Sequence, residues 1–109
     1  SVGQSLLIVF DEVDAGIGGR AADRVGDLLA DLSRDNQVLC ITHLPQIAAR
    51  GSRHFRVEKE SAEGNARTKI VSLSKSERVE EIARMAGGEV VTSTTRKHAR
   101  ELLARSVAS

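Results

Sequence analysis

Residues 6–10 form an unbroken apolar run that ends abruptly at three acids, Asp11, Glu12 and Asp14. A short strand that is apolar on both faces is typical of a parallel sheet with helices packed over it. Two unit charges roughly 4 Å apart repel by about 1 kcal/mol in water and by about 4 kcal/mol at a partly buried site. The segment therefore predicts a buried strand whose carboxyl end holds a cationic group between its acids.

A helix and a second strand are predicted to follow this run. Apolar residues recur at helical spacing beyond Gly18 and Gly19, which indicates an amphipathic helix facing the sheet. They are Ala21, Ala22, Val25, Leu28, Leu29 and Leu32. Residues 38–42 then complete a strand–helix–strand unit of the length expected for a parallel crossover. We expect Cys40 in this strand to be a small core residue, and residues 44–50 to form a short helix.

A β-hairpin is predicted in the middle of the chain. Phe55 and Val57 alternate with polar residues, and Val71 and Leu73 do the same after a polar loop over residues 61–65. Alternation of this kind is typical of a strand with one buried and one solvated face. We therefore expect a hairpin that exposes one face to water.

Two helices are predicted after the hairpin. Ser74 and Glu77 have the spacing of a capping box, and Gly87 and Gly88 would end the helix that it opens. A last helix is predicted over residues 93–105. The apolar faces of the two helices consist of Val79, Ile82, Ala83 and Ala86 in the first and Ala99, Leu102 and Leu103 in the second.

Length and composition favour one α/β domain over residues 1–109: a mostly parallel sheet flanked by helices, with the hairpin and the C-terminal helices added. Aromatic residues make up only 2% of the chain, so its core must be aliphatic. The formal net charge of +1 gives no long-range field toward nucleic acid or an anionic membrane. Since we find neither a leader segment nor an apolar run of membrane length, we expect a soluble cytoplasmic protein.

Aliphatic residues followed by Asp-Glu also have the pattern of a Walker B strand. In such a site the aspartate supports the Mg²⁺ that bridges the phosphates of a nucleotide, which is the role expected for Asp11. The following carboxylate, Glu12, is expected to orient the attacking water as a general base. The alternative is a strand that simply ends in solvated acids before a turn.

His43 ends the second predicted strand. Because parallel neighbours bring their carboxyl ends to the same edge of a sheet, we expect His43 to lie near Asp11 and Glu12. Its imidazole could hydrogen-bond a γ-phosphate oxygen or hold the attacking water. An ordinary surface histidine is the alternative. The other two histidines, His54 and His98, are expected to be solvated.

Together these features resemble the C-terminal lobe of an ABC-class ATPase head. Residues 10–19 (FDEVDAGIGG) and 40–48 (CITHLPQIA) look like the corresponding motifs of the RecN family, bacterial SMC-like proteins of DNA double-strand-break repair and recombination. The hairpin that ends near Leu73 and residues 84–88 (RMAGG) also fit that family. The resemblance therefore covers nearly the whole chain.

The resemblance implies a role for each matching residue. Asp11 would support Mg²⁺, Glu12 would be the catalytic glutamate, and His43 would be the switch histidine. Asp14 would open the D-loop that faces a second head, because the family sandwiches ATP between two heads of a homodimer. The nucleotide site would thus involve Asp11, Glu12, Asp14 and His43. The complete protein would act on DNA in the bacterial cytoplasm, associated with the nucleoid and not with a membrane.

The sequence departs from the family's full pattern in three features. It has no G-x-x-x-x-G-K-[ST] phosphate loop, no Ser-Gly-Gly signature segment and no helix of coiled-coil length. We therefore expect a C-terminal piece of a head that does not hydrolyse ATP alone. An N-terminal lobe with the Walker A loop would complete the binding of ATP and Mg²⁺.

Two other interpretations of the sequence stay open. Residues 16–21 satisfy the dinucleotide-binding pattern G-x-G-x-x-A, although acids intervene between strand and glycines and His43 stands where a ribose-binding acid is expected. The chain could also be a non-catalytic module whose hairpin and basic terminal helix contact DNA or another protein. The basic residues of that helix are Arg96, Lys97, Arg100 and Arg105.

Overall fold

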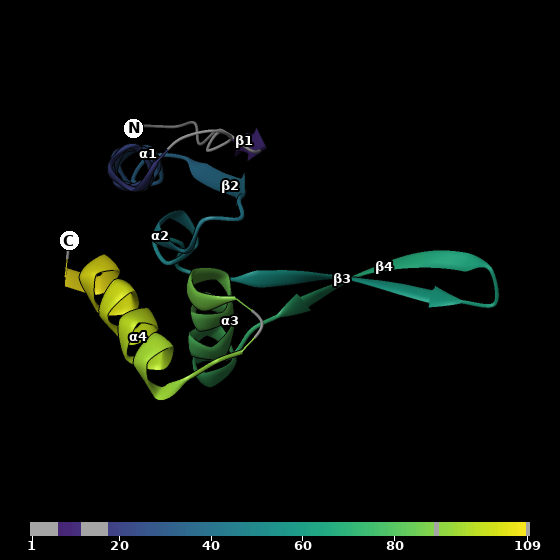
Figure 1. Ribbon diagram of the computed structural model, residues 1–109. Helices are drawn as coiled ribbons and strands as arrows, with labels where there is room; N and C mark the ends of the chain where they lie inside the picture. Colours follow the sequence, from purple (N-terminus) through teal and green to yellow (C-terminus); the bar gives the residue numbers. More distant parts are fainter. Residues whose placement is uncertain (1–6, 12–17, 89, 109) are drawn as a thin grey trace.

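The computed structural model describes residues 7–11, 18–88 and 90–108, without the side chains of Phe10, Asp11, Ala62 and residues 106–108. Strands and helices alternate through the first half of the chain, and two helices close it (Figure 1). The elements are β1 Leu7–Asp11, α1 Gly19–Leu32, β2 Gln37–Ile41, α2 Pro45–Ala48, β3 Phe55–Ala62, β4 Asn65–Ser72, α3 Lys75–Gly87 and α4 Ser93–Ala108. The predicted α/β class is confirmed, with the parallel part of the sheet limited to two described strands.

β1 and β2 pair in parallel, joined by α1 as the sequence predicts. One face of the pair carries Val38 and Cys40, which pack half-buried against α1 and α2. The other face is open: its large apolar side chains are 47–62% exposed. These are Leu7, Val9, Leu39 and Ile41. The expectation of a strand buried on both faces is therefore wrong within this chain, because the described elements cover only one face of the pair.

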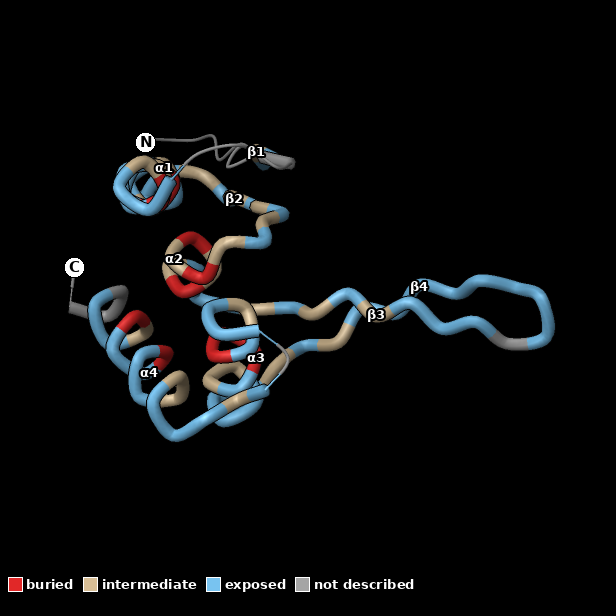
Figure 2. Tube along the Cα trace, in the orientation of Figure 1, coloured by how far each residue is buried: buried red, intermediate tan, exposed pale blue. Residues whose placement is uncertain are grey.

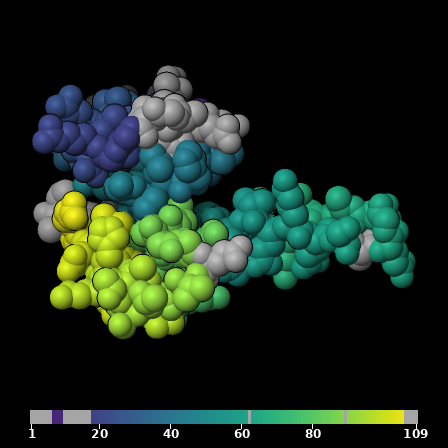
Figure 3. All heavy atoms as spheres, viewed as in Figure 1, coloured from purple at the N-terminus to yellow at the C-terminus, as the bar shows by residue number. Residues whose placement is uncertain are grey.

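β3 and β4 form the predicted hairpin, which extends from the body of the molecule as an arm (Figures 1 and 3). The predicted loop shortens to a two-residue turn, Glu63–Gly64, with φ of 51° and 80°. Two positive φ values match the twist of a tight hairpin. The expected buried face is wrong for β3, because Phe55 and Val57 are 42% and 59% exposed. Val71, which pairs with Arg56 and so lies on the other face of the hairpin, is half-buried as expected.

The core consists of two aliphatic clusters that the short helix α2 connects. Ala22, Leu29 and Ile47 form the first cluster. The second combines Ala49 with buried residues of the last two helices, Ile82, Ala83, Ala99 and Leu102. Figure 2 shows these buried positions gathered in the four helices, while the hairpin arm is mostly exposed.

Local hydrogen bonds fix where the last two helices begin. The Ser74 side chain accepts from the Glu77 amide at 3.3 Å and the Glu77 carboxylate accepts from the Ser74 amide at 2.9 Å, which confirms the capping box. Thr92 and Thr95 make the same reciprocal pair at the start of α4. Two expected inward residues are exposed instead, Leu28 and Ala86, because each helix buries a narrower stripe than its apolar spacing indicates.

No helix within the described ranges is both long and apolar enough to cross a membrane.

Candidate functional site

The carboxyl ends of β1 and β2 lie side by side. In the parallel register Asp11 is opposite Ile41, two residues before His43. The backbone thus brings the end of the acidic strand and the end of the histidine strand to the same sheet edge. The Asp11 side chain, Glu12 and Asp14 lie outside the described residues, so their predicted roles stay predictions.

The turn after β2 is built from three neighbouring residues around His43. The Thr42 hydroxyl accepts a hydrogen bond from the Leu44 amide at 3.0 Å, which closes a tight turn directly after the strand. Pro45 then opens α2, where its fixed φ suits the first helical turn and its missing N–H leaves no donor unpaired. The His43 side chain is exposed, and its backbone lies within the turn that the Thr42–Leu44 hydrogen bond closes.

Mg²⁺ is usually held by one or two carboxylates together with phosphate oxygens and water, so the aspartate predicted to bind it at this strand end, Asp11, would leave the remaining positions to a substrate. Within the residues that the structure describes, no group of three or more His, Cys, Asp or Glu could hold a metal ion by itself.

His54 is half-buried, so the expectation that it is solvated is wrong. Its pKa is lowered by burial first and then by the neighbouring positive charges of Arg78 and Arg56, while Glu81 opposes the shift. Its Nδ1 atom is buried and has no hydrogen-bond partner among the described residues. His98 is exposed on α4, as expected.

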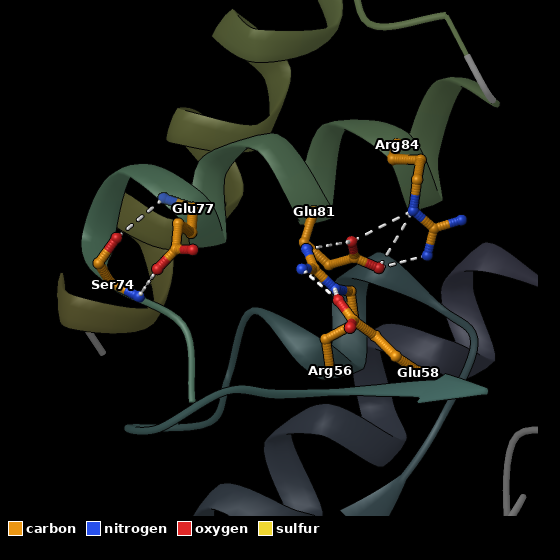
Figure 4. A network of polar contacts seen from close by, with 6 residues as sticks. All are labelled: Arg56, Glu58, Ser74, Glu77, Glu81 and Arg84. Carbon is orange, nitrogen blue, oxygen red and sulfur yellow. Dashed lines mark hydrogen bonds and ion pairs between the residues drawn. The ribbon is translucent and has the colours of Figure 1, made fainter. Parts of the chain in front are cut away.

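A network of charged residues ties the base of the hairpin to α3 (Figure 4). Glu81, only 6% exposed, accepts hydrogen bonds from Arg84 and faces Arg56 of β3 at 3.8 Å. Arg56 also donates to Glu58 of its own strand. The pKa of Glu81 is held low, first by the hydrogen bond from Arg84 and then by the surrounding positive charges. The network thus links the start of β3 to α3.

A cavity of about 700 Å³ lies away from the ends of β1 and β2. The link from α2 to β3, the start of α3 and the middle of α4 enclose it. Sequence reasoning singled out Arg100 as part of a basic helix but missed the other cations here, because they come from segments that meet only in the fold. Those cations are Arg50, Arg53, Lys75 and Arg78.

Three similar proteins found by comparison all have the same name. No protein-family profile matches the chain. Over 96 residues it is 48% identical to the DNA repair protein RecN of Bacillus subtilis (strain 168), 50% identical to that of Xylella fastidiosa (strain 9a5c) and 47% identical to that of Haemophilus influenzae. Each match covers 88% of this chain and 17% of the relative, so the chain spans less than a fifth of these proteins.

A solved structure shares the fold. It comes from work described as "Structural biochemistry of ATP-driven dimerization and DNA stimulated activation of SMC ATPases", and it matches with a TM-score of 0.58 at 23% identity. The match covers 77% of this chain and 50% of the solved chain. The arrangement of strands and helices is therefore one found in SMC ATPases.

Proposed function

We propose that this chain, which is 48% and 50% identical over 96 residues to two RecN proteins, is the C-terminal lobe of an ATP-hydrolysing head that acts in DNA repair. The observation that supports the proposal most is the parallel register of β1 and β2, with Asp11 opposite Ile41. This register gives the acidic strand and the histidine strand a common end, which one nucleotide could occupy.

Each residue of the proposed site has a distinct task. Asp11 supports Mg²⁺, which when bound neutralises charge on the phosphates of ATP. Glu12 orients the attacking water and accepts its proton. His43 hydrogen-bonds a phosphate oxygen and so distinguishes ATP from its hydrolysed products. Asp14 faces a second head across the D-loop.

We propose that a lobe carrying the Walker A phosphate loop covers the open face of the β1–β2 pair. The support is the group of four large apolar side chains on that face, of which Leu7 is 62% and Val9 is 55% exposed. Apolar burial stabilises by about 25 cal/mol per Å², so such a face favours a protein partner over water. The phosphate loop would supply the backbone amides and the lysine that hold the β- and γ-phosphates.

The direct test substitutes the proposed catalytic residues in the full-length protein. Glu12→Gln is expected to leave ATP binding intact and to reduce hydrolysis by at least two orders of magnitude, since a general base contributes about 10²–10⁴-fold. His43→Ala is expected to slow hydrolysis as well. His98→Ala, an exposed histidine on α4, is the matched control and should turn over ATP at the wild-type rate.

Undiminished hydrolysis in Glu12→Gln would remove Glu12 from its assigned role. A second experiment mixes the 109-residue chain with a separate lobe that carries the phosphate loop. We expect neither piece alone to hydrolyse ATP and the mixture to do so. Activity in the chain alone would contradict the division of the site between two lobes.

A further inference from the structure

The cavity beside α3 concentrates positive charge that the chain as a whole lacks. Five cationic side chains line it, and none of its described lining residues is acidic. The whole chain carries a formal charge of only +1. Clefts lined by one sign of charge focus their field and raise the local concentration of the opposite ion. The cavity is therefore suited to an anion.

Three exposed cations of the cavity, Arg53, Lys75 and Arg100, make no ion pair within the part of the chain that the structure describes. Arg53 instead lies over the Phe55 ring, 5.3 Å from its centroid, so among the described residues only Lys75 and Arg100 lack a competing partner. By contrast, Arg50 lies 3.3 Å from Asp27, and Arg96 outside the cavity is bound by Glu80 at 2.7 Å. The charge available to a ligand thus comes first from Lys75 and Arg100.

Unpartnered polar atoms mark the same cavity. Among the described residues, three buried side-chain nitrogen or oxygen atoms have no hydrogen-bond partner, and two of these belong to cavity-lining residues, His54 Nδ1 and Arg78 Nε. Native proteins leave few such atoms, so each one calls for an explanation. Arg78 also donates to the carbonyls of Ala48 and Ala49 at 3.0 and 3.2 Å, which fixes its guanidinium in the cavity wall.

We propose that this cavity is a phosphate-binding site that takes a backbone phosphate of duplex DNA. Phosphate is an anion for which lysine and arginine are typical ligands. A volume of about 700 Å³ is large enough for a sugar-phosphate unit that stays attached to a duplex outside. The identification of DNA as the source of the phosphate rests on the proposed function, and the binding of phosphate rests on the cavity.

The test measures binding of fluorescein-labelled duplex DNA to the full-length protein by anisotropy, without nucleotide and over a range of salt concentrations. The double variant Lys75→Ala/Arg100→Ala is expected to bind at least tenfold more weakly. Its plot of log affinity against log salt should lose about one to two units of slope, because each phosphate contact contributes about 0.9. The charge-conserving pair Lys75→Arg/Arg100→Lys should restore both quantities.

The control variant Arg24→Ala/Lys97→Ala removes the same charge from exposed positions outside the cavity. We expect its affinity to change less than twofold. An equal loss in both double variants would overturn the proposal, since general charge would then explain it. Titration with inorganic phosphate, followed by ³¹P NMR, separates the sources: saturable phosphate binding with unchanged DNA affinity in Lys75→Ala/Arg100→Ala would overturn the assignment to DNA.

These measurements are independent of ATP hydrolysis. A Glu12→Gln protein that binds DNA normally but hydrolyses ATP at the wild-type rate would contradict the catalytic proposal alone. Loss of the cavity effect with intact hydrolysis would contradict the DNA-phosphate site alone.

Discussion

Glu81 is the one buried acid among the described residues, held on α3 between the guanidinium groups of Arg84 and Arg56. The hydrogen bond from Arg84 and the nearby positive charges lower its pKa, so the ionised form stabilises the fold above its unfolded pKa near 4.3, and this stabilisation is lost as pH falls through the folded pKa. We expect Glu81→Gln to lower the free energy of unfolding by about 1–3 kcal/mol at pH 7. In urea denaturation the difference from wild type should shrink as the pH falls below about 4. The exposed control Glu101→Gln should change little at either pH.

His54 makes the free energy of unfolding depend on pH in the neutral range. Burial, Arg78 and Arg56 lower its pKa, although Glu81 opposes them. The unfolded chain therefore binds the proton first, so stability is full above about pH 6.5 and falls as the pH drops, with a limiting slope of about 1.4 kcal/mol per pH unit. We expect His54→Gln to flatten the dependence of the unfolding free energy on pH between 7.5 and 5.5, whereas His98→Gln keeps the wild-type slope. An unchanged slope in His54→Gln would contradict the assignment.

At the scale of elements, the contact between the end of α3 and the start of α4 depends on a glycine. A Cβ atom at Gly87 would lie 2.5 Å from Thr95 Cγ2 and 3.3 Å from Thr95 Cβ. Thr95 cannot easily move, because it makes the reciprocal hydrogen bonds with Thr92 that begin α4. We expect Gly87→Ala to destabilise by about 1–3 kcal/mol through overpacking. Gly19→Ala, whose Cβ would meet only Gln46 Nε2 at 3.9 Å among the described residues, is the control and should not destabilise α1 in thermal unfolding.

The elements that sequence predicts well are those governed by neighbouring residues. The capping box at Ser74, the strand–helix–strand unit and the hairpin each depend on local chemistry or on a short period, and all are present. Partners distant in sequence decide the rest. The pKa of the half-buried His54 is lowered by Arg78 of α3, 24 positions later, and most of the hairpin is exposed because no other described element covers it beyond its base. At the site, the sequence predicts that β1 and β2 end at the same sheet edge, because parallel neighbours do so. The basic cavity could not be predicted, because its cations come from separate segments of the chain.

Across the whole molecule, α2 holds the two halves of the core together. Ile47, 4% exposed, belongs to the cluster under α1, and Ala49, 2% exposed, belongs to the cluster between α3 and α4. We expect Ile47→Ala to lower the free energy of unfolding by about 2–5 kcal/mol, as burial at this level predicts. Because α2 connects both clusters, amide hydrogen exchange of the Ile47→Ala variant should be faster in α4 as well as in α1. Faster exchange confined to α1 would contradict this connection.

Apolar side chains on the open face of the β1–β2 pair should contribute more to association with another lobe than to the stability of this chain. Leu39 and Ile41 are 47% and 51% exposed, so this chain does not fully bury their apolar side chains. Replacing both with threonine removes apolar area from the face, and threonine is itself favourable in strands. We expect Leu39→Thr/Ile41→Thr to weaken association with the phosphate-loop lobe by roughly tenfold or more, since about 1 kcal/mol per half-exposed side chain would be lost there. The unfolding free energy of the chain alone should fall by less than the association energy does. Ile70→Thr, on the equally exposed hairpin, is the control for apolar loss outside the face. Calorimetric titration of the two lobes measures the association, and equal weakening by Ile70→Thr would show that the β1–β2 face has no special part in it.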